Sequence, residues 1–286
     1  MKMEKEKKLL AEKINEAEMV LVGIGEEFGE SMDKGKAIPQ LAECFQAIEK
    51  NERQSWMLPY LEKLQEDWLG TEKTAKAYET LEKLLEQKNY FIVSTRMDDY
   101  IYETKLKKEK IVTPCGGNRF LQCPDGCGKH LYQADGQLPG KIYEYLMGKG
   151  NGKTGEVPAV SDLKLAGEDE GRDQISCPTC PECGKYLVFN NRKAKQYVEE
   201  GYLEQWNKYM RWLQGTVNKR LCVLELGVGM QYPTVIRWPF ERVTFINEKS
   251  SMFRIHSKLY HLTEEIKDRG YKIQEKPIDF LINWFV

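Results

Sequence analysis

Five of the eight cysteines lie in two short clusters, and their spacing predicts a metal site. The first cluster holds Cys123 and Cys127, and the second holds Cys177, Cys180 and Cys183. Thiolates three or four positions apart can reach the same ion. The glycines that follow Cys127 and Cys183 permit a tight turn, which directs backbone N–H groups at a bound sulfur. Four thiolates are a set that Zn²⁺ binds tetrahedrally, so the clusters predict a zinc site.

Other interpretations of these clusters stay open. A disulfide pair in a secreted protein competes with zinc, although the chain carries no apolar segment typical of secretion. Cys177 competes with Cys183 as the partner of Cys180, and Gly184 favours Cys183. His130 could reach the metal, but we expect it to pack or to face solvent. The predicted zinc ligands are Cys123, Cys127, Cys180 and Cys183. Four protein ligands leave no open position for chemistry, so we expect the zinc to be structural.

Two predicted strands each run into a Gly-x-Gly turn. Met19–Val22 precedes the first turn and Leu221–Leu226 precedes the second. Such a turn opens a nucleotide-binding βα unit, because glycines let the backbone approach a phosphate. The second occurrence makes the first more credible. The predicted nucleotide-binding positions are Gly23, Ile24 and Gly25 in one turn and Gly227, Val228 and Gly229 in the other.

Acidic residues weaken the first turn as a phosphate site. Glu26 and Glu27 stand where a pyrophosphate requires N–H groups and no negative charge. A glycine turn followed by acidic first-turn residues is therefore the alternative interpretation.

Polar residues follow two further predicted strands, where doubly wound sheets place ligands. Tyr90–Ser94 is followed by Thr95, Arg96 and Asp98, and Val243–Asn247 ends in a polar amide. Asp98 or its neighbour Asp99 could instead cap a strand-to-helix turn. Arg96 could pair with Glu26, Glu27 or Asp99. We expect Thr95, Arg96, Asp98 and Asn247 to contribute to the nucleotide site.

Strands and helices alternate in the remaining pattern, with apolar stripes at helical spacing. The chain is predicted to be an α/β protein, with a Rossmann-like parallel sheet flanked by helices and a small zinc-binding domain inserted. The expected helices cover 4–17, 37–86, 195–216 and 276–286, and the expected short strands cover 111–114, 186–189 and 269–273.

The predicted domain boundaries follow from this pattern. Residues 1–112 and 190–286 are assigned to the Rossmann-like domain, with a helical insertion at about 30–86. Residues 113–189 form the zinc-binding module. Its segment 148–175 is rich in Gly, Lys, Asp and Glu and is predicted to be a mobile loop.

Bulk composition excludes some classes of function. Among 286 residues, 43 Lys and Arg nearly balance 44 Asp and Glu, for a net charge of −1. A general nucleic-acid or membrane-surface binder would carry a basic excess. The charged N-terminus lacks the apolar run of a signal peptide, and no apolar span is long enough for a membrane helix. We therefore expect a cytoplasmic protein without a nucleic-acid or membrane partner.

The order of these motifs resembles that of the sirtuins, which are NAD-dependent protein deacylases and ADP-ribosyltransferases. Gly23–Gly25 matches the family's phosphate turn, and Ser94–Asp98 resembles its Thr-Gln-Asn-Ile-Asp segment. Val112–Gly116 matches its catalytic His-Gly stretch. Gly227–Gly229 and Phe245–Asn247 match the later strand ends that hold the adenosine half of NAD. The cysteine pairs match its zinc site, and the first pair and residues 224–233 are similar to the bacterial macrodomain-linked branch.

The departures from the family pattern bear on the reaction. Cys115 stands at the position of the family's catalytic histidine, and Arg96 at that of its asparagine, while the aspartate is kept as Asp98. No counterpart of the family's arginine-bearing loop follows Gly25. The macrodomain-linked branch, whose members are thought to ADP-ribosylate proteins, also lacks the histidine. The resemblance therefore implies ADP-ribosyl transfer from NAD to a protein substrate rather than deacylation of an acylated one.

The resemblance places Asp98 and Cys115 at the reaction centre. In sirtuin chemistry the nicotinamide–ribose bond breaks, and a nucleophile captures an oxocarbenium-like carbon. A carboxylate at Asp98 could orient the ribose or stabilise the positive carbon. Cys115 can act as a base only as a thiolate, and it is more often a small residue at a tight turn. The alternatives are a non-catalytic module that binds NAD or a related nucleotide for a protein partner, and a zinc protein without a nucleotide.

Overall fold

The computed structural model describes residues 2–29, 38–69, 72–147 and 175–284, which divide into two compact units. The larger unit comprises Met1–Ser31, Gly70–Gly117 and Glu199–Val286, and the smaller comprises Met32–Leu69 and Asn118–Val198. Residues 32–69, which we assigned to the Rossmann-like domain as an insertion, thus belong to the unit that carries the cysteines. The predicted mobile loop 148–175 lies, except for Ile175, outside the described residues.

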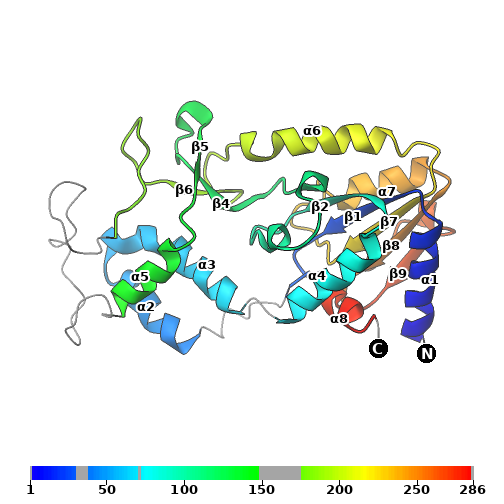
Figure 1. Cartoon of the computed structure of the whole chain (residues 1–286), viewed down its shortest axis with the longest axis horizontal. Helices are drawn as coiled ribbons and strands as arrows, with labels where there is room; N and C mark the ends of the chain where they lie inside the picture. Colours follow the sequence, from blue (N-terminus) through cyan, green and yellow to red (C-terminus); the bar gives the residue numbers. More distant parts are fainter. Residues whose placement is uncertain (1, 30–37, 70–71, 148–174, 285–286) are drawn as a thin grey trace. The chain divides into compact units, whose positions relative to one another are not determined.

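A six-stranded parallel sheet in the order β3-β2-β1-β7-β8-β9 forms the centre of the larger unit (Figure 1). This is a doubly wound Rossmann-like order, which reverses direction between β1 and β7. The fold class predicted from the sequence is confirmed. The strands are β1 (Met19–Ile24), β2 (Asn89–Ser94), β3 (Ile111–Val112), β7 (Leu221–Leu226), β8 (Ser250–Ile255) and β9 (Gly270–Ile273).

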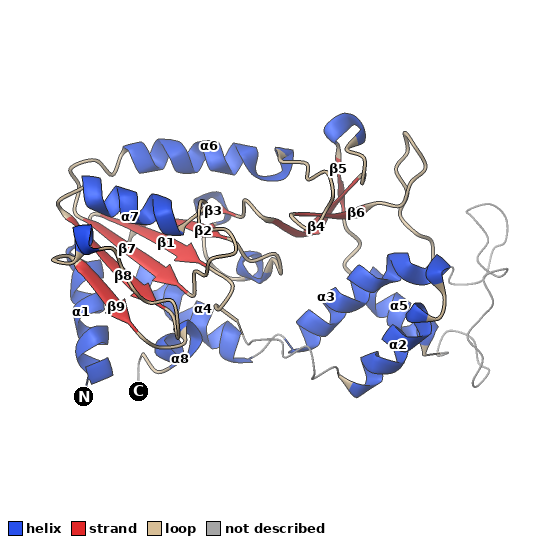
Figure 2. Cartoon of the chain, turned by 180° about the vertical axis from the view of Figure 1, so that it is seen from behind, coloured by secondary structure: helices blue, strands red, loops and turns tan. Residues whose placement is uncertain are grey.

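Two helical layers bury the two faces of this sheet, because successive strand residues point to opposite sides. Val20, Val22 and Ile24 of β1 pack with α1, α4 and α8, whereas Met19 and Leu21 pack with α6 and α7. Figure 2 shows the sheet between these layers. The helices are α1 (Lys2–Glu16), α4 (Glu72–Leu85), α6 (Glu200–Gln214), α7 (Arg237–Ile246) and α8 (Pro277–Ile282), with short 3₁₀ helices η2 (Tyr100–Glu103), η3 (Lys108–Lys110) and η6 (Glu264–Ile266).

The prediction of a strand at Val243–Asn247 is wrong. These residues form the end of α7, in which Arg237, Phe240 and Thr244 are buried at the spacing of one helical face. The run of β-branched and aromatic residues suggested a strand, but packing against the sheet decided the local structure. The strand of this region is β8, which begins at Ser250.

The smaller unit combines a helical part with a three-stranded sheet in the order β5-β4-β6. Both parts share one apolar core, which includes Leu41, Leu61 and Ile142 from helices and Leu121 and Phe189 from strands. The elements are α2 (Pro39–Glu49), η1 (Glu52–Met57), α3 (Leu58–Leu69), β4 (Gly116–Gln122), η4 (Cys127–Lys129), β5 (Leu131–Gln133), α5 (Leu138–Leu146) and β6 (Val188–Asn191).

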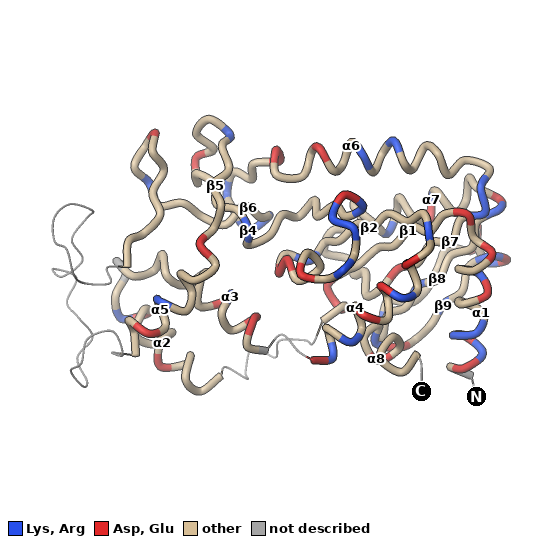
Figure 3. The backbone as a smooth tube through the Cα atoms, in the orientation of Figure 1, with Lys and Arg blue, Asp and Glu red and all other residues tan. Residues whose placement is uncertain are grey.

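Charges of both signs are interspersed along the described chain (Figure 3). Many pair locally on helices, such as Lys63 with Asp67 at 2.7 Å and Lys76 with Glu72 at 2.6 Å. None of the described helices is long and apolar enough to span a membrane.

Candidate functional site

The strand ends that precede most of the predicted site residues meet at one edge of the larger unit's sheet. The parallel register places Ile24 beside Ser94 on one side and beside Leu226 on the other, and Leu226 beside Ile255. The order of strands reverses between β1 and β7, and open α/β sheets bind ligands outside the carboxyl ends at such a point. We call this region, made of the residues that follow β3, β2, β1, β7 and β8, the carboxyl edge.

The two glycine turns interlock at the carboxyl edge. The N–H of Gly25 donates to the carbonyl of Leu226 at 2.9 Å, and the N–H of Gly227 donates to that of Ile255 at 2.9 Å. A Cβ atom on Gly25 would lie 2.3 Å from Cα of Val228. Gly227 has a φ of 65°, which L side chains rarely adopt. The glycines thus allow two backbones to pack in direct contact, and the turns form one rigid element.

The carboxylates of Glu26 and Glu27 occupy backbone donors of the neighbouring strand ends. Glu26 accepts the N–H of Gly229 at 2.8 Å. Glu27 accepts the N–H of Ser257 at 2.9 Å and also its hydroxyl. We call Glu26, Glu27 and these contacts the acidic latch. It supplies, from within the chain, negative charge of the kind that a phosphate would bring.

Residues after β2 hold the next part of the carboxyl edge. The N–H of Thr95 donates to the carbonyl of Ile24 at 2.9 Å, and the Arg96 guanidinium pairs with the carboxylate of Asp98. Arg96 also donates to the Glu26 carbonyl at 3.4 Å. The other oxygen of Asp98 accepts the N–H of Tyr100 at 3.1 Å. Arg96 therefore pairs with Asp98, a partner that the sequence analysis did not consider, and Asp98 also caps a turn.

Tyr78 of α4 contacts both the loop after β1 and the loop after β2, a role that no sequence pattern indicated. Its ring packs edge-on against Phe28 at 4.9 Å and stacks on Tyr100 at 5.9 Å. Its buried hydroxyl has no hydrogen-bond partner among the described residues, and burial raises its pKa, so it stays protonated.

Cys115 lies in the tight turn after β3. The turn closes with the N–H of Gly116 donating to the carbonyl of Thr113 at 2.9 Å, and Gly116 has a φ of 72°. The Cys115 side chain is 1% exposed. Burial supports the interpretation of Cys115 as a small residue at a tight turn rather than as a base that a substrate can reach.

Asn247 does not lie with the other predicted residues. It follows α7 and precedes β8, so it sits at the amino edge of the sheet. Its side-chain amide donates to the carbonyls of Thr216 and Lys219 at 3.0 Å each. These hydrogen bonds hold the segment before β7 in place. Asn247 therefore has a structural role, far from the carboxyl edge.

His256 and Ser257 occupy the strand end that we had assigned to Asn247. His256 is buried, and its Nδ1 accepts the N–H groups of Lys258 and Leu259 at 3.1 Å each. The same nitrogen lies 3.0 Å from a carboxylate oxygen of Glu27. Burial lowers the pKa of His256, and this effect outweighs the opposing effect of the Glu27 carboxylate. The polar pair after the alternating strand SSMFRI was the signal that could have identified this position.

Arg237 braces the loops after β7 and β8. Its guanidinium donates to the carbonyl of Val228 at 2.8 Å and to that of Leu259 at 2.7 Å. Beneath it, Arg254 and Glu225 form a buried ion pair at 2.5 Å between directly opposed residues of β8 and β7. Burial raises the pKa of Glu225, and Arg254 opposes this shift. Through its hydrogen bonds to these carbonyls, the buried Arg237 holds the loops after β7 and β8 in position.

The four predicted zinc ligands converge in the smaller unit. The sulfur atoms of Cys123, Cys127, Cys180 and Cys183 all lie within 4.8 Å of one another, and those of Cys123 and Cys183 are 3.6 Å apart. Zn–S bonds of about 2.3 Å at tetrahedral angles require S···S separations of roughly 3.8 Å, which fits this cluster. All four thiols are free rather than joined as disulfides.

Local turns aim the backbone at these sulfurs as the sequence suggested. Gly126, Gly128 and Gly184 all have positive φ, between 58° and 71°. Burial raises the pKa of Cys123, but N–H groups of Cys127 and Asp125 outweigh it and lower the pKa to about 7. The neighbouring Cys123 thiol raises the pKa of Cys127 to about 12, as expected when one thiolate lies beside another group of the same kind. A thiol that ionises easily is a good zinc ligand.

Cys177 and His130 stand apart from the cluster. The Cys177 thiol contacts the carbonyl of Pro178 at 3.7 Å, and burial raises its pKa to about 12. The exposed His130 ring lies 3.8 Å from Glu182.

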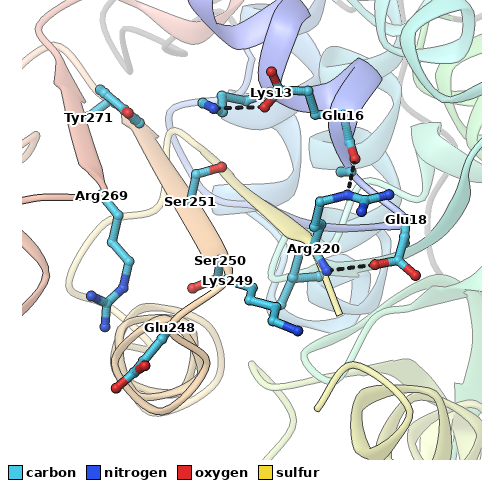
Figure 4. Close-up of a pocket in the computed structure, with 12 residues that line it drawn as sticks. Lys13, Glu16, Glu18, Arg220, Glu248, Lys249, Ser250, Ser251, Arg269 and Tyr271 are labelled. Atoms are coloured by element: carbon cyan, nitrogen blue, oxygen red, sulfur yellow. Dashed lines mark hydrogen bonds and ion pairs between the residues drawn. The ribbon is translucent and has the colours of Figure 1, made fainter. Parts of the chain in front are cut away.

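A pocket of about 500 Å³ opens at the amino edge of the large sheet, away from the carboxyl edge. Figure 4 marks contacts among Lys13, Glu16, Glu18 and Arg220 of its lining. Lys13 pairs with Glu16 at 2.7 Å, and Glu18 accepts the N–H of Arg220 at 3.0 Å. Arg269 donates to the last carbonyls of α7. We assign no function to this pocket.

Sheet order, interlocked glycine turns and a cysteine cluster define a doubly wound nucleotide-binding type of fold with a thiolate module. Comparison with solved structures identifies the fold as that of the sirtuins. One similar structure, from a study of sirtuin substrate affinity, has a TM-score of 0.51 and 13% identity and matches over 96% of this chain and 94% of that one. A Sir2 complex with the inhibitor EX-527, 2′-O-acetyl-ADP-ribose and deacetylated p53 peptide has a TM-score of 0.51, 12% identity and coverage of 96% and 95%.

Two curated proteins are related in sequence. A protein ADP-ribosyltransferase of Staphylococcus aureus is 24% identical over 202 residues, which cover 70% of this chain and 57% of the relative. A probable bifunctional ADP-ribose hydrolase/ADP-ribosyltransferase of Fusarium oxysporum f. sp. cubense is 26% identical over 156 residues. These residues cover 53% of this chain and 23% of the relative. The chain thus spans just over half of the first relative and under a quarter of the second. No family model matches the chain.

Proposed function

We propose that this chain is an NAD-dependent protein-modifying domain that transfers ADP-ribose to a protein acceptor. The observation that carries the proposal is the carboxyl edge, where Gly25, Asp98 and Gly227 follow neighbouring strands at the reversal of strand order. The sirtuin fold and the names of the two curated relatives, both of which include ADP-ribosyltransferase, support the same chemistry.

Asp98 is the side chain best suited to the reaction. Transfer breaks the bond between nicotinamide and ribose and joins the ribose carbon to a nucleophile of the acceptor protein. A fixed carboxylate stabilises the positive charge that develops on this carbon. Arg96 and the N–H of Tyr100 hold the Asp98 carboxylate in place.

Transfer is favoured over deacylation because the position of a base is held by Cys115. Deacylation requires a group that accepts a proton from a ribose hydroxyl. The Cys115 thiol is buried and lacks the exposure that such a base requires. Transfer of ADP-ribose to a nucleophilic acceptor depends less than deacylation does on a residue that relays a proton.

A non-catalytic module that binds a nucleotide for a partner is the second candidate. The acidic latch favours it, because Glu26 and Glu27 occupy the N–H groups of Gly229 and Ser257. The two candidates differ in turnover and not in binding.

The test is incubation of the protein with labelled NAD and cell extract, with free nicotinamide and labelled protein as the two readouts. We expect both products from the wild-type chain. Asp98→Asn should reduce their formation by about 100-fold, because it removes one charge that acts in the transition state. Label and nicotinamide at wild-type rates in Asp98→Asn would refute the role of this carboxylate. Binding of NAD without either product would favour the second candidate.

In the smaller unit, we propose that Cys123, Cys127, Cys180 and Cys183 hold one structural zinc ion. Their convergence, free thiols and glycine turns support this assignment. All four positions of the metal would then be filled by protein, so the ion would stabilise the unit and not act on a substrate.

A further inference from the structure

The side chain of Glu26 differs from that of Glu27 in how it is held. Glu27 has two partners on Ser257, borders His256 and is 22% exposed. Glu26 is exposed, and its carboxylate accepts the N–H of Gly229 at 2.8 Å. Within the acidic latch, Glu27 is therefore held by two hydrogen bonds. Glu26 is exposed to solvent and is held by a single backbone donor.

The backbone that carries Glu26 is fixed on several sides. The Glu26 carbonyl accepts a hydrogen bond from Arg96, and the N–H groups of Gly25 and Glu27 donate to the carbonyls of Leu226 and Gly227. The Cα of Gly29 lies against the Arg96 guanidinium, where a Cβ would come within 2.4 Å of it. Rotation of the Glu26 side chain would leave this backbone in place.

If the Glu26 side chain rotated away, the backbone N–H of Gly229 would become available close to the buried cation of Arg237. The N–H of Gly229 would lose its acceptor, and Arg237 would remain behind the carbonyl of Val228. Burial lowers the pKa of Arg237, but the guanidinium stays charged at neutral pH. Backbone N–H groups of a glycine turn near a fixed cation form a site for an anionic oxygen.

We infer that Glu26 is an internal competitor for phosphate at the carboxyl edge. Its carboxylate occupies the Gly229 donor, so a nucleotide that carries phosphate must displace it, whereas an uncharged nucleoside need not. The inference rests on the proposed function, since it concerns the selectivity and control of the same site. It makes Glu26 a residue that sets the affinity for NAD and ADP-ribose without contacting the reacting carbon.

The test compares the wild-type chain with Glu26→Ala and Glu26→Gln by calorimetry with NAD, ADP-ribose and adenosine. Glu26→Ala removes both the charge and the acceptor, and Glu26→Gln keeps an acceptor without the charge. We expect ADP-ribose and NAD to bind at least about tenfold more tightly to Glu26→Ala, since a hydrogen bond to a charged group no longer competes. Glu26→Gln should lie between, and adenosine should bind all three equally.

Glu248→Gln is the matched control. It removes the same charge at the amino edge of the sheet, so it reports long-range electrostatic effects alone. Hydrogen exchange of the Gly229 amide gives a readout without ligand. Exchange should accelerate in Glu26→Ala and not in Glu248→Gln.

Three results would overturn the inference, and they can be told apart. Equal affinity of ADP-ribose for the wild type and Glu26→Ala would refute competition by Glu26 and leave the proposed function standing. No binding of NAD, ADP-ribose or adenosine to any variant would remove the proposed function together with the inference. A tenfold gain that Glu248→Gln also produces would assign the effect to net charge and refute Glu26 as a local competitor.

Discussion

The cysteine cluster of the smaller unit and the carboxyl edge of the larger unit differ in whether their polar groups already have partners within the chain. In the smaller unit four sulfurs converge, and neighbouring N–H groups donate to that of Cys123, so the arrangement suits the addition of a cation. At the carboxyl edge of the larger unit, Glu26 and Glu27 fill backbone donors from within the chain. The cysteine cluster gathers four sulfurs whose negative charge, once they ionise, a metal cation would balance. At the carboxyl edge, by contrast, glutamate side chains of the same chain already accept the hydrogen bonds of the backbone donors. A ligand of the first adds to the structure, whereas a phosphate at the second must replace part of it.

The difference also concerns how stability is supplied. The larger unit buries its own ion pair and two apolar layers around a sheet, so it can fold on its internal contacts. The smaller unit has a shared apolar core, but its cysteine loops depend on short turns and a short β5-β4-β6 sheet. We therefore expect metal removal to affect the two units unequally.

The largest effect should follow replacement of a buried sulfur. Cys180→Ser removes one of four thiolates, and we expect bound zinc to fall from about one ion per chain to near zero, as structural zinc sites need all their ligands. Metal content by mass spectrometry and protease resistance of the smaller unit are the measurements. Cys177→Ser is the control, because its thiol lies outside the cluster. Equal zinc content in both variants would refute the assignment.

A smaller effect should follow separation of the two glycine turns. Gly25→Ala would place a Cβ 2.3 Å from Cα of Val228, so backbone must move, and we expect a loss of about 1–3 kcal/mol in the free energy of unfolding. Binding of NAD should weaken with it. Urea denaturation and calorimetry are the measurements.

Gly140→Ala supplies the contrast in the smaller unit. Gly140 lies in α5 with no atom within 4 Å of the position of a Cβ, so alanine should stabilise the helix by about 0.5–1 kcal/mol. A Gly25→Ala variant as stable as the wild type would mean that the turns do not interlock in solution.

The same contrast explains what could be predicted from the sequence. The cysteine ligands lie three or four residues apart in each pair, and the following glycines signal the turns, so local spacing was sufficient. The edge residues come from strands far apart in the chain. Gly25 and Gly227 could be placed because each follows an apolar run, but their direct contact depends on sheet order, which residue types do not encode.

Residues whose partners are distant were the ones missed or misplaced. Asn247 was assigned to a strand end because Val243–Ile246 has high β propensity, whereas packing of Phe240 and Thr244 made it a helix. The contacts of Glu26 and Glu27 span more than 200 residues along the chain, so no local pattern could reveal them.

The smallest effect concerns His256, the residue next to the latch. Glu27, Glu26, Arg237 and Arg254 act on it, and burial lowers its pKa in the folded state below the ordinary value of about 6.5. The unfolded chain therefore takes up this proton first as the pH falls. The stability that the neutral ring contributes is complete above about pH 6.5 and is lost as the pH falls through the folded-state pKa.

His256→Asn keeps an oxygen acceptor for the N–H groups of Lys258 and Leu259 but does not titrate. We expect its melting temperature to fall less than that of the wild type between pH 7.5 and pH 5.5. His261→Asn, an exposed ring stacked on Tyr260 at 4.3 Å, is the control and should follow the wild type. Identical pH profiles for the wild type and His256→Asn would show that the pKa of His256 is the same in the folded and unfolded states, so burial does not disfavour the charged ring. A melting temperature that falls less for the wild type than for His256→Asn would show a raised pKa instead, and the carboxyl edge would then gain an ion pair between His256 and Glu27 as the pH falls.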